Sequence, residues 1–92
     1  MFDFILSEWY RNRGFFNTGV EASEQLGLHG EALNIILPDN NIIITRIDRI
    51  SNQDDSVRTG PRVALANYFQ ANYQVGVIIQ YLIVNPNQIQ IL

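Results

Sequence analysis

The segment Asn67–Val84, NYFQANYQVGVIIQYLIV, decides the fold because its hydrophobic period changes halfway along. One helix face is predicted by four large apolar side chains at helical spacing, Leu65, Tyr68, Phe69 and Tyr73. This helix is expected to start near Thr59, with Pro61 in its first turn, and to break at Gly76. The run Val77–Val84 is apolar at odd and even positions, which is typical of a central strand buried on both faces. The run is too short to span a bilayer, which takes roughly 18–20 residues.

Two hairpins are predicted around this helix. From Ala32 the hydrophobic period is two, and the turn residues Pro38–Asn41 lead into a second strand, Ile42–Ile50, rich in β-branched residues. After the central strand, Asn85–Asn87 turn the chain into a last strand in which isoleucines alternate with glutamines. The polar segment Ser51–Ser56 is expected to be a solvated connector.

The N-terminal third is predicted to contain two short helices. Asp3 is expected to cap the first, whose apolar stripe consists of Phe2, Ile5, Leu6 and Trp9. Gly14 should end it, and Phe15–Phe16 should open a short strand. Thr18–Glu21 matches a capping box for the second helix, which a left-handed Gly27 should stop.

These elements predict a mainly β chain with two or three short helices, an α+β fold that forms a small open β-barrel or pseudobarrel. A parallel sheet needs crossovers of a dozen or more residues. Only one segment, Arg58–Tyr73, offers such a crossover. No linker or repeat divides the sequence, so residues 1–92 are expected to form a single domain, either alone or as a module of a larger protein.

The composition limits the function classes. Cysteine is absent, which excludes disulfides, thiolate zinc sites and thiol catalysis. All six cations are arginines, and nine acidic residues give a net charge of −3, so DNA affinity would have to come from local patches. With no basic leader and no membrane-length apolar run, we expect a cytoplasmic location and no membrane partner.

No residues form a catalytic or cofactor motif. His29 is the only histidine, and none of the serines stands in a nucleophile-elbow context. The carboxylate pairs Asp54–Asp55 and Glu21/Glu24 are expected to be solvated, and no loop has the ligand spacing of an EF-hand or the glycines of a phosphate loop. We therefore expect no enzyme activity, no metal site and no cofactor.

The pattern Leu65-x-x-Tyr68-Phe69-x-x-Asn72-x-x-x-Gly76-x-Ile78-x-Tyr81-x-Ile83 resembles the closing segment of the DNA-binding pseudobarrel superfamily. That superfamily includes the plant auxin-response type of transcription-factor domain and the effector-binding domain of EcoRII-like restriction endonucleases. The resemblance covers about twenty residues. It implies roles in transcription regulation or restriction–modification.

The resemblance implies that two arms recognise double-stranded DNA in the major groove. The arm residues would be Arg11, Asn12, Arg13 and Asn17 in the first arm, and Arg46, Arg49, Asn52, Gln53 and Arg58 in the second. Arginine can pair with guanine, and asparagine or glutamine with adenine, each for about 1–3 kcal/mol of discrimination. The other interpretation is that the arginines form ordinary ion pairs with nearby carboxylates, Asp48, Asp54 and Asp55.

A protein-interaction or homo-oligomeric assembly subunit is the alternative function. Its interface would be aromatic and poor in charge, built from the apolar first helix, Phe15–Phe16, Tyr10, Tyr68, Tyr73 and Tyr81. Salt separates the two functions, because DNA binding weakens steeply as salt rises whereas such an assembly does not.

Overall fold

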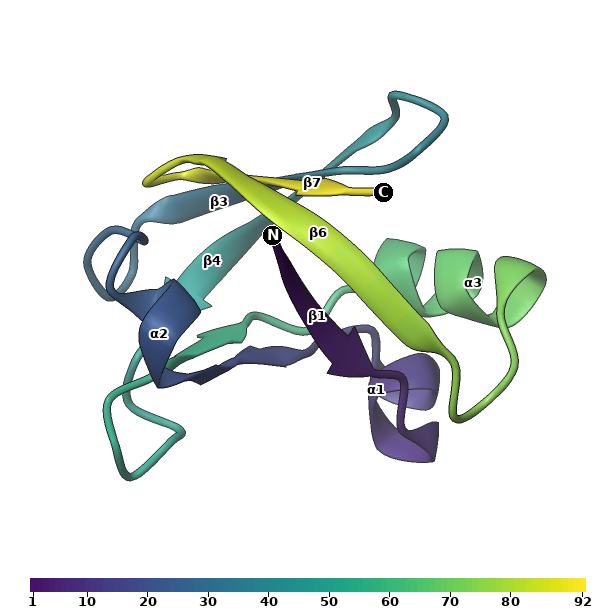
Figure 1. The fold of residues 1–92 in the computed structure, drawn as a ribbon, viewed down its shortest axis with the longest axis horizontal. Coiled ribbons are helices and arrows are strands. Elements are labelled where there is room, and N and C mark those ends of the chain that lie inside the picture. Colours follow the sequence, from purple (N-terminus) through teal and green to yellow (C-terminus); the bar gives the residue numbers. More distant parts are fainter.

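Seven strands and three helices make up the computed structural model, which describes all 92 residues, Met1–Leu92 (Figure 1). In chain order the elements are β1 (Phe2–Ile5), α1 (Glu8–Arg13), β2 (Asn17–Thr18), α2 (Gly19–Ser23), β3 (Ala32–Ile36), β4 (Ile42–Asp48), β5 (Val57–Thr59), α3 (Val63–Asn72), β6 (Ile78–Asn85) and β7 (Gln88–Ile91). The strand order is β1-β6-β7-β3-β4-β5-β2, with only β3 and β7 parallel. The sheet curls into a nearly closed barrel with one seam, between β1 and β2, which confirms the predicted fold class.

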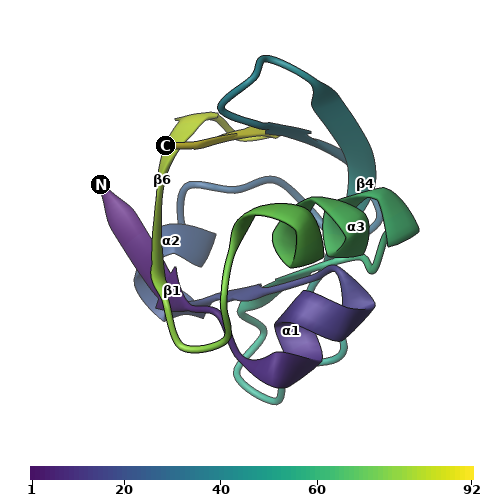
Figure 2. The same cartoon turned by 90° about the vertical axis from the view of Figure 1, so that its right-hand side faces the viewer.

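The strand predicted from the apolar run is confirmed as β6, which lies between β1 and β7. Its expected burial on both faces is wrong. Ile79 and Tyr81 point into the barrel, whereas Ile78 and Val84 are 65% and 56% exposed. The barrel fills only its own interior, and α1 and α3 lie at one of its ends rather than over the outside of β6 (Figure 2).

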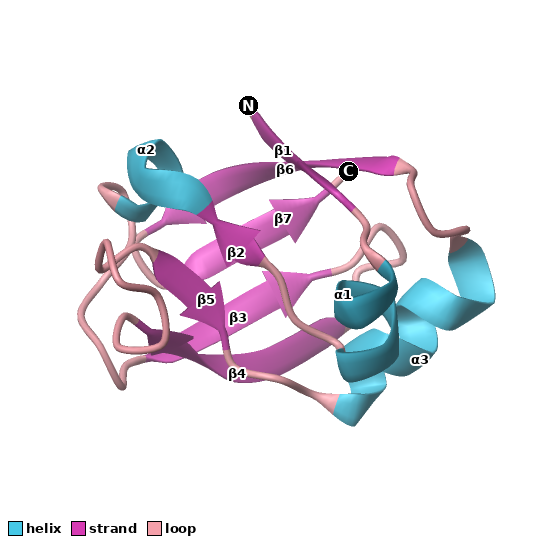
Figure 3. Cartoon of the chain, turned by 90° about the horizontal axis from the view of Figure 1, so that it is seen from below, coloured by secondary structure: helices cyan, strands magenta, loops and turns pink.

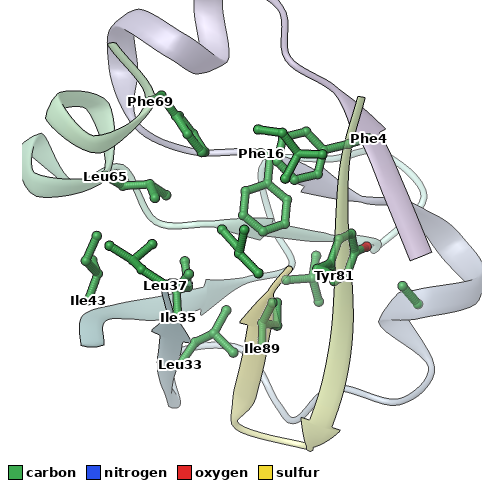
Figure 4. Packing of buried hydrophobic residues seen from close by; sticks show 14 of the residues in the cluster. Phe4, Phe16, Leu33, Ile35, Leu37, Ile43, Leu65, Phe69, Tyr81 and Ile89 are labelled. Carbon is green, nitrogen blue, oxygen red and sulfur yellow. The ribbon is translucent and has the colours of Figure 1, made fainter. Parts of the chain in front are cut away.

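Tyr81 links the two sides of the seam from inside the core. Its ring is fully buried beside Phe4 and Phe16, which stack with centroids 4.2 Å apart (Figure 4). Its hydroxyl donates to the backbone oxygen of Thr18, at the end of β2, over 3.3 Å. Burial raises the pKa of Tyr81 above its ordinary value. One side chain of β6 therefore ties down β2, a strand with which β6 does not pair.

The first predicted helix is wrong, because Phe2–Ile5 forms strand β1. Phe4 points inward and Ile5 outward, and each pairs with a residue of β6. Helix α1 starts only after Ser7, whose hydroxyl accepts a hydrogen bond from the Tyr10 amide over 3.0 Å, so Asp3 caps nothing. Gly14 ends α1 in the left-handed conformation, φ +74°, as predicted.

The predicted start and end signals of α2 are also wrong. The Thr18 hydroxyl makes no capping bond and lies instead 2.9 Å from the Ser23 hydroxyl in the core. Gly27 does not adopt a positive φ, and the helix ends at Ser23. The side chains that fix this segment are therefore buried partners rather than helix caps.

The sequence pattern does not predict β5, which is only three residues long. Thr59 was expected to cap α3, but it belongs to β5, and its hydroxyl accepts a hydrogen bond from the Phe16 amide over 3.1 Å. Helix α3 begins after Arg62. The predicted hairpins are confirmed as β3–β4 and β6–β7. Each of the three helices is too short, or not apolar enough, to cross a bilayer.

Candidate nucleic-acid interface

Figure 3 shows β2, β5 and β4 on one side of the barrel, with α1 and α3 at its end. Four of the six arginines belong to these elements or border them: Arg13 ends α1, Arg46 lies in β4, Arg58 in β5, and Arg62 directly precedes α3. Strand register brings them together: Arg58 pairs with Asn17 on one side and Asp48 on the other, and the Gly60 amide donates to the Arg46 backbone oxygen. Pro61 then borders both Arg46 and Arg62. We call this surface the arginine face, defined by Arg13, Arg46, Arg58 and Arg62 with Asn17 and Asn52.

Arg58 makes more side-chain contacts than any other cation of the arginine face. Its guanidinium lies over the rings of Phe15 and Trp9, 5.0 and 5.8 Å from their centroids. Nε donates to Asn17 Oδ1 and Nη2 to Asn52 Oδ1, both over 3.2 Å. Arginine has five N–H donors, so three remain free for a ligand. The Trp9 ring is 57% exposed and extends this site outward.

Asn17 and Asn52 join the two predicted arms. Asn52 Nδ2 donates to Asn17 Oδ1 over 3.0 Å and also to the Ser56 backbone oxygen. An open polar groove of about 610 Å³ lies beside them and includes exposed Gln53. The segment Ser51–Ser56 is therefore held against β2 rather than being only a solvated connector.

A second groove, of about 350 Å³, separates the end of α1 from the start of α3. It is lined by Asn12, Arg13, Pro61, Arg62, Val63, Ala66, Asn67 and Gln70, with no carboxylate among them. Arg62 Nε donates to the Ile44 backbone oxygen over 2.9 Å, which leaves both terminal nitrogens free. The sequence pattern did not single out Arg62, although its position directly after Pro61 at a helix start was a usable signal.

Two of the arginines predicted to contact DNA, Arg11 and Arg49, donate hydrogen bonds to the protein's own backbone. Arg49 donates to the carbonyl oxygens of Ser23, Leu26, Gly27 and Asp55, over 2.7 to 3.2 Å. Arg11 donates to the carbonyl oxygens of Gln70 and Tyr73, at the end of α3. These contacts use four of the five donors of Arg49, so its role in this structure is to hold α2 and the β4–β5 loop together.

Replacing Arg49 with alanine should therefore destabilise the fold. Hydrogen bonds to a charged group contribute about 1.5–3 kcal/mol each when buried, but these carbonyls are only part-buried, so we expect a total loss of about 2 kcal/mol. Urea unfolding followed by circular dichroism would measure it. Arg46→Ala is the matched control, since exposed Arg46 has no side-chain hydrogen bond and should cost less than about 0.5 kcal/mol. Equal losses in the two variants would contradict this role.

The expectation that the arginines form ion pairs is wrong. No arginine nitrogen lies within 4.0 Å of a carboxylate oxygen, and the one close contact of this kind, His29 Nδ1 to Asp48 Oδ1 at 4.0 Å, is an ion pair only when His29 is protonated. Partial burial acts to raise the pKa of Asp48, but hydrogen bonds from Ser51 and Ile50 and the nearby His29 together lower it. The Ser56 hydroxyl and amide likewise lower the pKa of Asp54. Both carboxylates thus cap turns in the β4–β5 loop rather than neutralise an arginine.

Charge is unevenly distributed over the molecule. The arginine face has four arginines and is bordered by Asp48 and Asp54, so its net charge is +2 (4 − 2). The whole chain has a net charge of −3, so the remaining residues carry −5 (−3 − 2). Such a distribution orients a polyanion toward one side during approach. The acidic total therefore does not prevent a local anion-binding surface.

The aromatic interface expected for assembly is not exposed. Phe15, Phe16 and Tyr81 are buried, and the tyrosines at 10, 68 and 73 are half-buried against the core. Trp9 is the only large aromatic side chain that is mostly exposed. Apart from Trp9, the large exposed apolar side chains are Met1 and aliphatic residues.

His29 lies in the loop before β3, and its Nδ1 accepts a hydrogen bond from the Arg49 amide over 3.1 Å. No three histidine, aspartate or glutamate side chains lie close enough together to hold a metal ion.

Comparison of the chain with protein-family models, with curated proteins and with solved structures gives no match.

Proposed function

We propose that the protein binds double-stranded DNA through the arginine face and does so without catalysis. The observation that carries this proposal is Arg58, whose guanidinium is held by two asparagines and two rings yet has no carboxylate partner. A fixed, unneutralised fork with free donors suits bidentate contact with guanine O6 and N7. The barrel fold and the resemblance of its closing segment to DNA-binding pseudobarrels support the same proposal, with transcription regulation or restriction–modification as the process.

The other members of the arginine face have separate tasks in this proposal. Arg13, Arg46 and Arg62 have free terminal nitrogens and are suited to phosphate oxygens, which position a protein on the duplex. The free Nδ2 group of Asn17 lies beside Arg58, and exposed Gln53 lines the same groove as Asn17, so both amides can reach base edges. Recognition would thus combine base contacts near the β4–β5 loop with phosphate contacts near α1 and α3.

Arg58→Ala should weaken binding to a mixed-sequence duplex by about 5- to 150-fold, because one bidentate contact is worth about 1–3 kcal/mol. Fluorescence anisotropy at fixed salt would measure this. Gln74→Glu is the charge-matched control: it also lowers the net charge by one, from −3 to −4, but at an exposed position past the end of α3. Arg58→Lys keeps the charge without the fork and should recover only part of the affinity.

Two outcomes would count against this site. If Gln74→Glu weakens binding as much as Arg58→Ala, net charge rather than the arginine face governs affinity. If the wild-type protein does not bind duplex DNA at low salt, the proposed function itself fails. A thermal melt of each variant checks that it is folded.

A further inference from the structure

A small pocket beside Arg46 contains the only histidine of the chain. Its volume is about 210 Å³, and its walls come from the loop before β3, the end of β4 and the connection from β5 to α3. Pro61 lines both this pocket and the groove beside Arg62, so the pocket continues the arginine face. We call it the His29 pocket, lined by His29, Gly30, Arg46, Ile47, Asp48, Gly60 and Pro61.

Backbone pairing fixes the walls of the His29 pocket. The Gly30 amide donates to the Ile47 carbonyl over 2.8 Å, which ties the loop before β3 to β4. Arg46 and Asp48 lie on either side of buried Ile47 in β4, so both of their side chains point outward. On this outward side His29 Nδ1 lies 4.0 Å from Asp48 Oδ1. The imidazole, the guanidinium and the carboxylate therefore share one small space.

The groups left free in the pocket are hydrogen-bond donors. His29 Nδ1 accepts a hydrogen bond from the Arg49 amide over 3.1 Å, so the proton of the neutral ring lies on Nε2, which has no partner. The exposed Arg46 side chain makes no hydrogen bond, whereas Asp48 already accepts from two backbone amides of its own loop, over 2.9 and 3.0 Å. Pockets for drug-sized ligands measure about 300–1,000 Å³. A smaller pocket with free donors suits a small oxyanion.

We propose that the His29 pocket binds a phosphate group and binds it more tightly when His29 is protonated. With Arg46 and Asp48 both charged, the pocket has a net charge of 0 (1 − 1) when the imidazole is neutral and +1 when it is protonated. Protonation turns Nδ1 into a donor, so the hydrogen bond from the Arg49 amide gives way to attraction by Asp48. Nε2 and the Arg46 guanidinium then offer two cationic donors to one phosphate.

The other charged groups near His29 do not supply this switch. The Arg49 guanidinium is directed to backbone carbonyls of the α2 segment and its own loop. Glu31 Oε1 accepts a hydrogen bond from the Leu28 amide over 2.6 Å. Burial alone would raise the pKa of Asp48, but hydrogen bonds from its own loop lower it overall, so Asp48 stays ionised at about pH 5.5. An unperturbed histidine, by contrast, changes charge near pH 6.5.

Proton NMR tests the pocket itself, because the single histidine gives one Cε1 proton signal. Sulfate, whose charge stays constant over this pH range, stands in for phosphate. In about 50 mM sodium sulfate the pH midpoint of this signal should rise by about 0.3 unit or more over sodium chloride of equal ionic strength. Such a rise requires sulfate to bind the protonated form at least about twofold more tightly, by reciprocal linkage.

Two arginine variants locate the sulfate. Arg46→Ala should abolish the rise in the midpoint, because it removes the second donor of the pocket. Arg13→Ala is the matched control: Arg13 is also exposed and free of side-chain hydrogen bonds, but it lies outside the pocket, so the rise should persist. A wild-type midpoint that is the same in the two salts would overturn the proposal, as would equal rises in the two variants.

Duplex DNA tests whether the phosphate belongs to a nucleic acid, and this part rests on the proposed function. In about 0.1 M salt, fluorescence anisotropy should show binding up to about 8-fold tighter at about pH 5.5 than at about pH 7.0, because one more phosphate is neutralised. His29→Asn should remove this difference, since asparagine keeps an acceptor for the Arg49 amide but does not titrate. Adding Gln74→His to that variant places a histidine past the end of α3 and should not restore it.

The two experiments separate the inference from the proposed function. A midpoint raised by sulfate, together with DNA binding that is equal at both pH values, would support the pocket as a site for a free phosphate rather than for the DNA backbone. Absence of DNA binding at both pH values would refute the proposed function, and the sulfate result would still decide for or against the pocket.

Discussion

Tyr81→Ala is expected to lower the free energy of unfolding by about 4 kcal/mol, as other buried aromatic-to-alanine changes do. Tyr81 is fully buried beside the stacked pair Phe4 and Phe16, and its hydroxyl donates to the Thr18 carbonyl across the seam. The change therefore removes both core volume and the tie to β2. A domain of this length has only about 5–14 kcal/mol of stability, so a large share would be lost. Urea unfolding would measure it.

Tyr81→Phe separates these two contributions. It keeps the ring and removes only the hydrogen bond, so it should cost about 1 kcal/mol. The raised pKa of Tyr81 means that the folded state keeps a proton that the unfolded state loses above about pH 10, so wild-type stability falls as pH rises past that value. Tyr81→Phe should lose less stability over the same pH range. Equal costs for the alanine and phenylalanine variants would show that Tyr81 does not fill the core.

Gly14→Ala is expected to cost about 4 kcal/mol and to separate α1 from α3. Gly14 has φ +74°, where a side chain costs about 1–2 kcal/mol. A Cβ at this position would also lie 2.1 Å from the Arg62 backbone oxygen and 2.6 Å from the Ala66 nitrogen. Neither backbone atom can move without shifting α3, and such overpacking costs about 1–3 kcal/mol more. Thermal unfolding followed by circular dichroism would measure the loss.

Gly30→Ala is the control for the backbone conformation alone. Gly30 has a similar φ of +87°, but a Cβ there meets no atom within 4 Å. This variant should cost only about 1–2 kcal/mol. If Gly14→Ala costs no more stability than Gly30→Ala, Gly14 does not approach the α3 backbone as closely as the structure places it. Because Arg13 and Arg62 flank this contact, Gly14→Ala should also weaken DNA binding under the proposed function.

The hairpins and the β6 strand could be predicted because their patterns match one structure only. Pro38–Asn41 and Asn85–Asn87 are turn residues between β-branched runs, a pattern that fits a hairpin and no helix. The local preference and the strand pairing in the folded barrel therefore agree. Phe2, Ile5 and Leu6 fit a helix stripe as well as a strand, and pairing with β6 decides for the strand. The three residues of β5 are too few to show any period.

The site was predictable in residue type but not in role. Arginines and amides near two loops were expected to be exposed together, and Arg58, Asn17 and Asn52 do lie in contact. Arg49 is also an arginine near a loop, but its side chain donates to four backbone carbonyls. These carbonyls come together only when the α2 segment packs against the β4–β5 loop. Similarly, the exposure of Ile78 depends on which barrel face the helices leave uncovered, and an apolar run does not encode that choice.

The salt dependence of wild-type binding to a mixed-sequence duplex tests the proposed function most directly. If Arg13, Arg46 and Arg62 each neutralise one phosphate, the logarithm of the association constant should fall against the logarithm of salt concentration with a slope of about −3. The double variant Arg13→Ala/Arg62→Ala should make that slope shallower by about 2. Absence of binding at low salt, or a slope near zero, would contradict recognition of DNA by the arginine face.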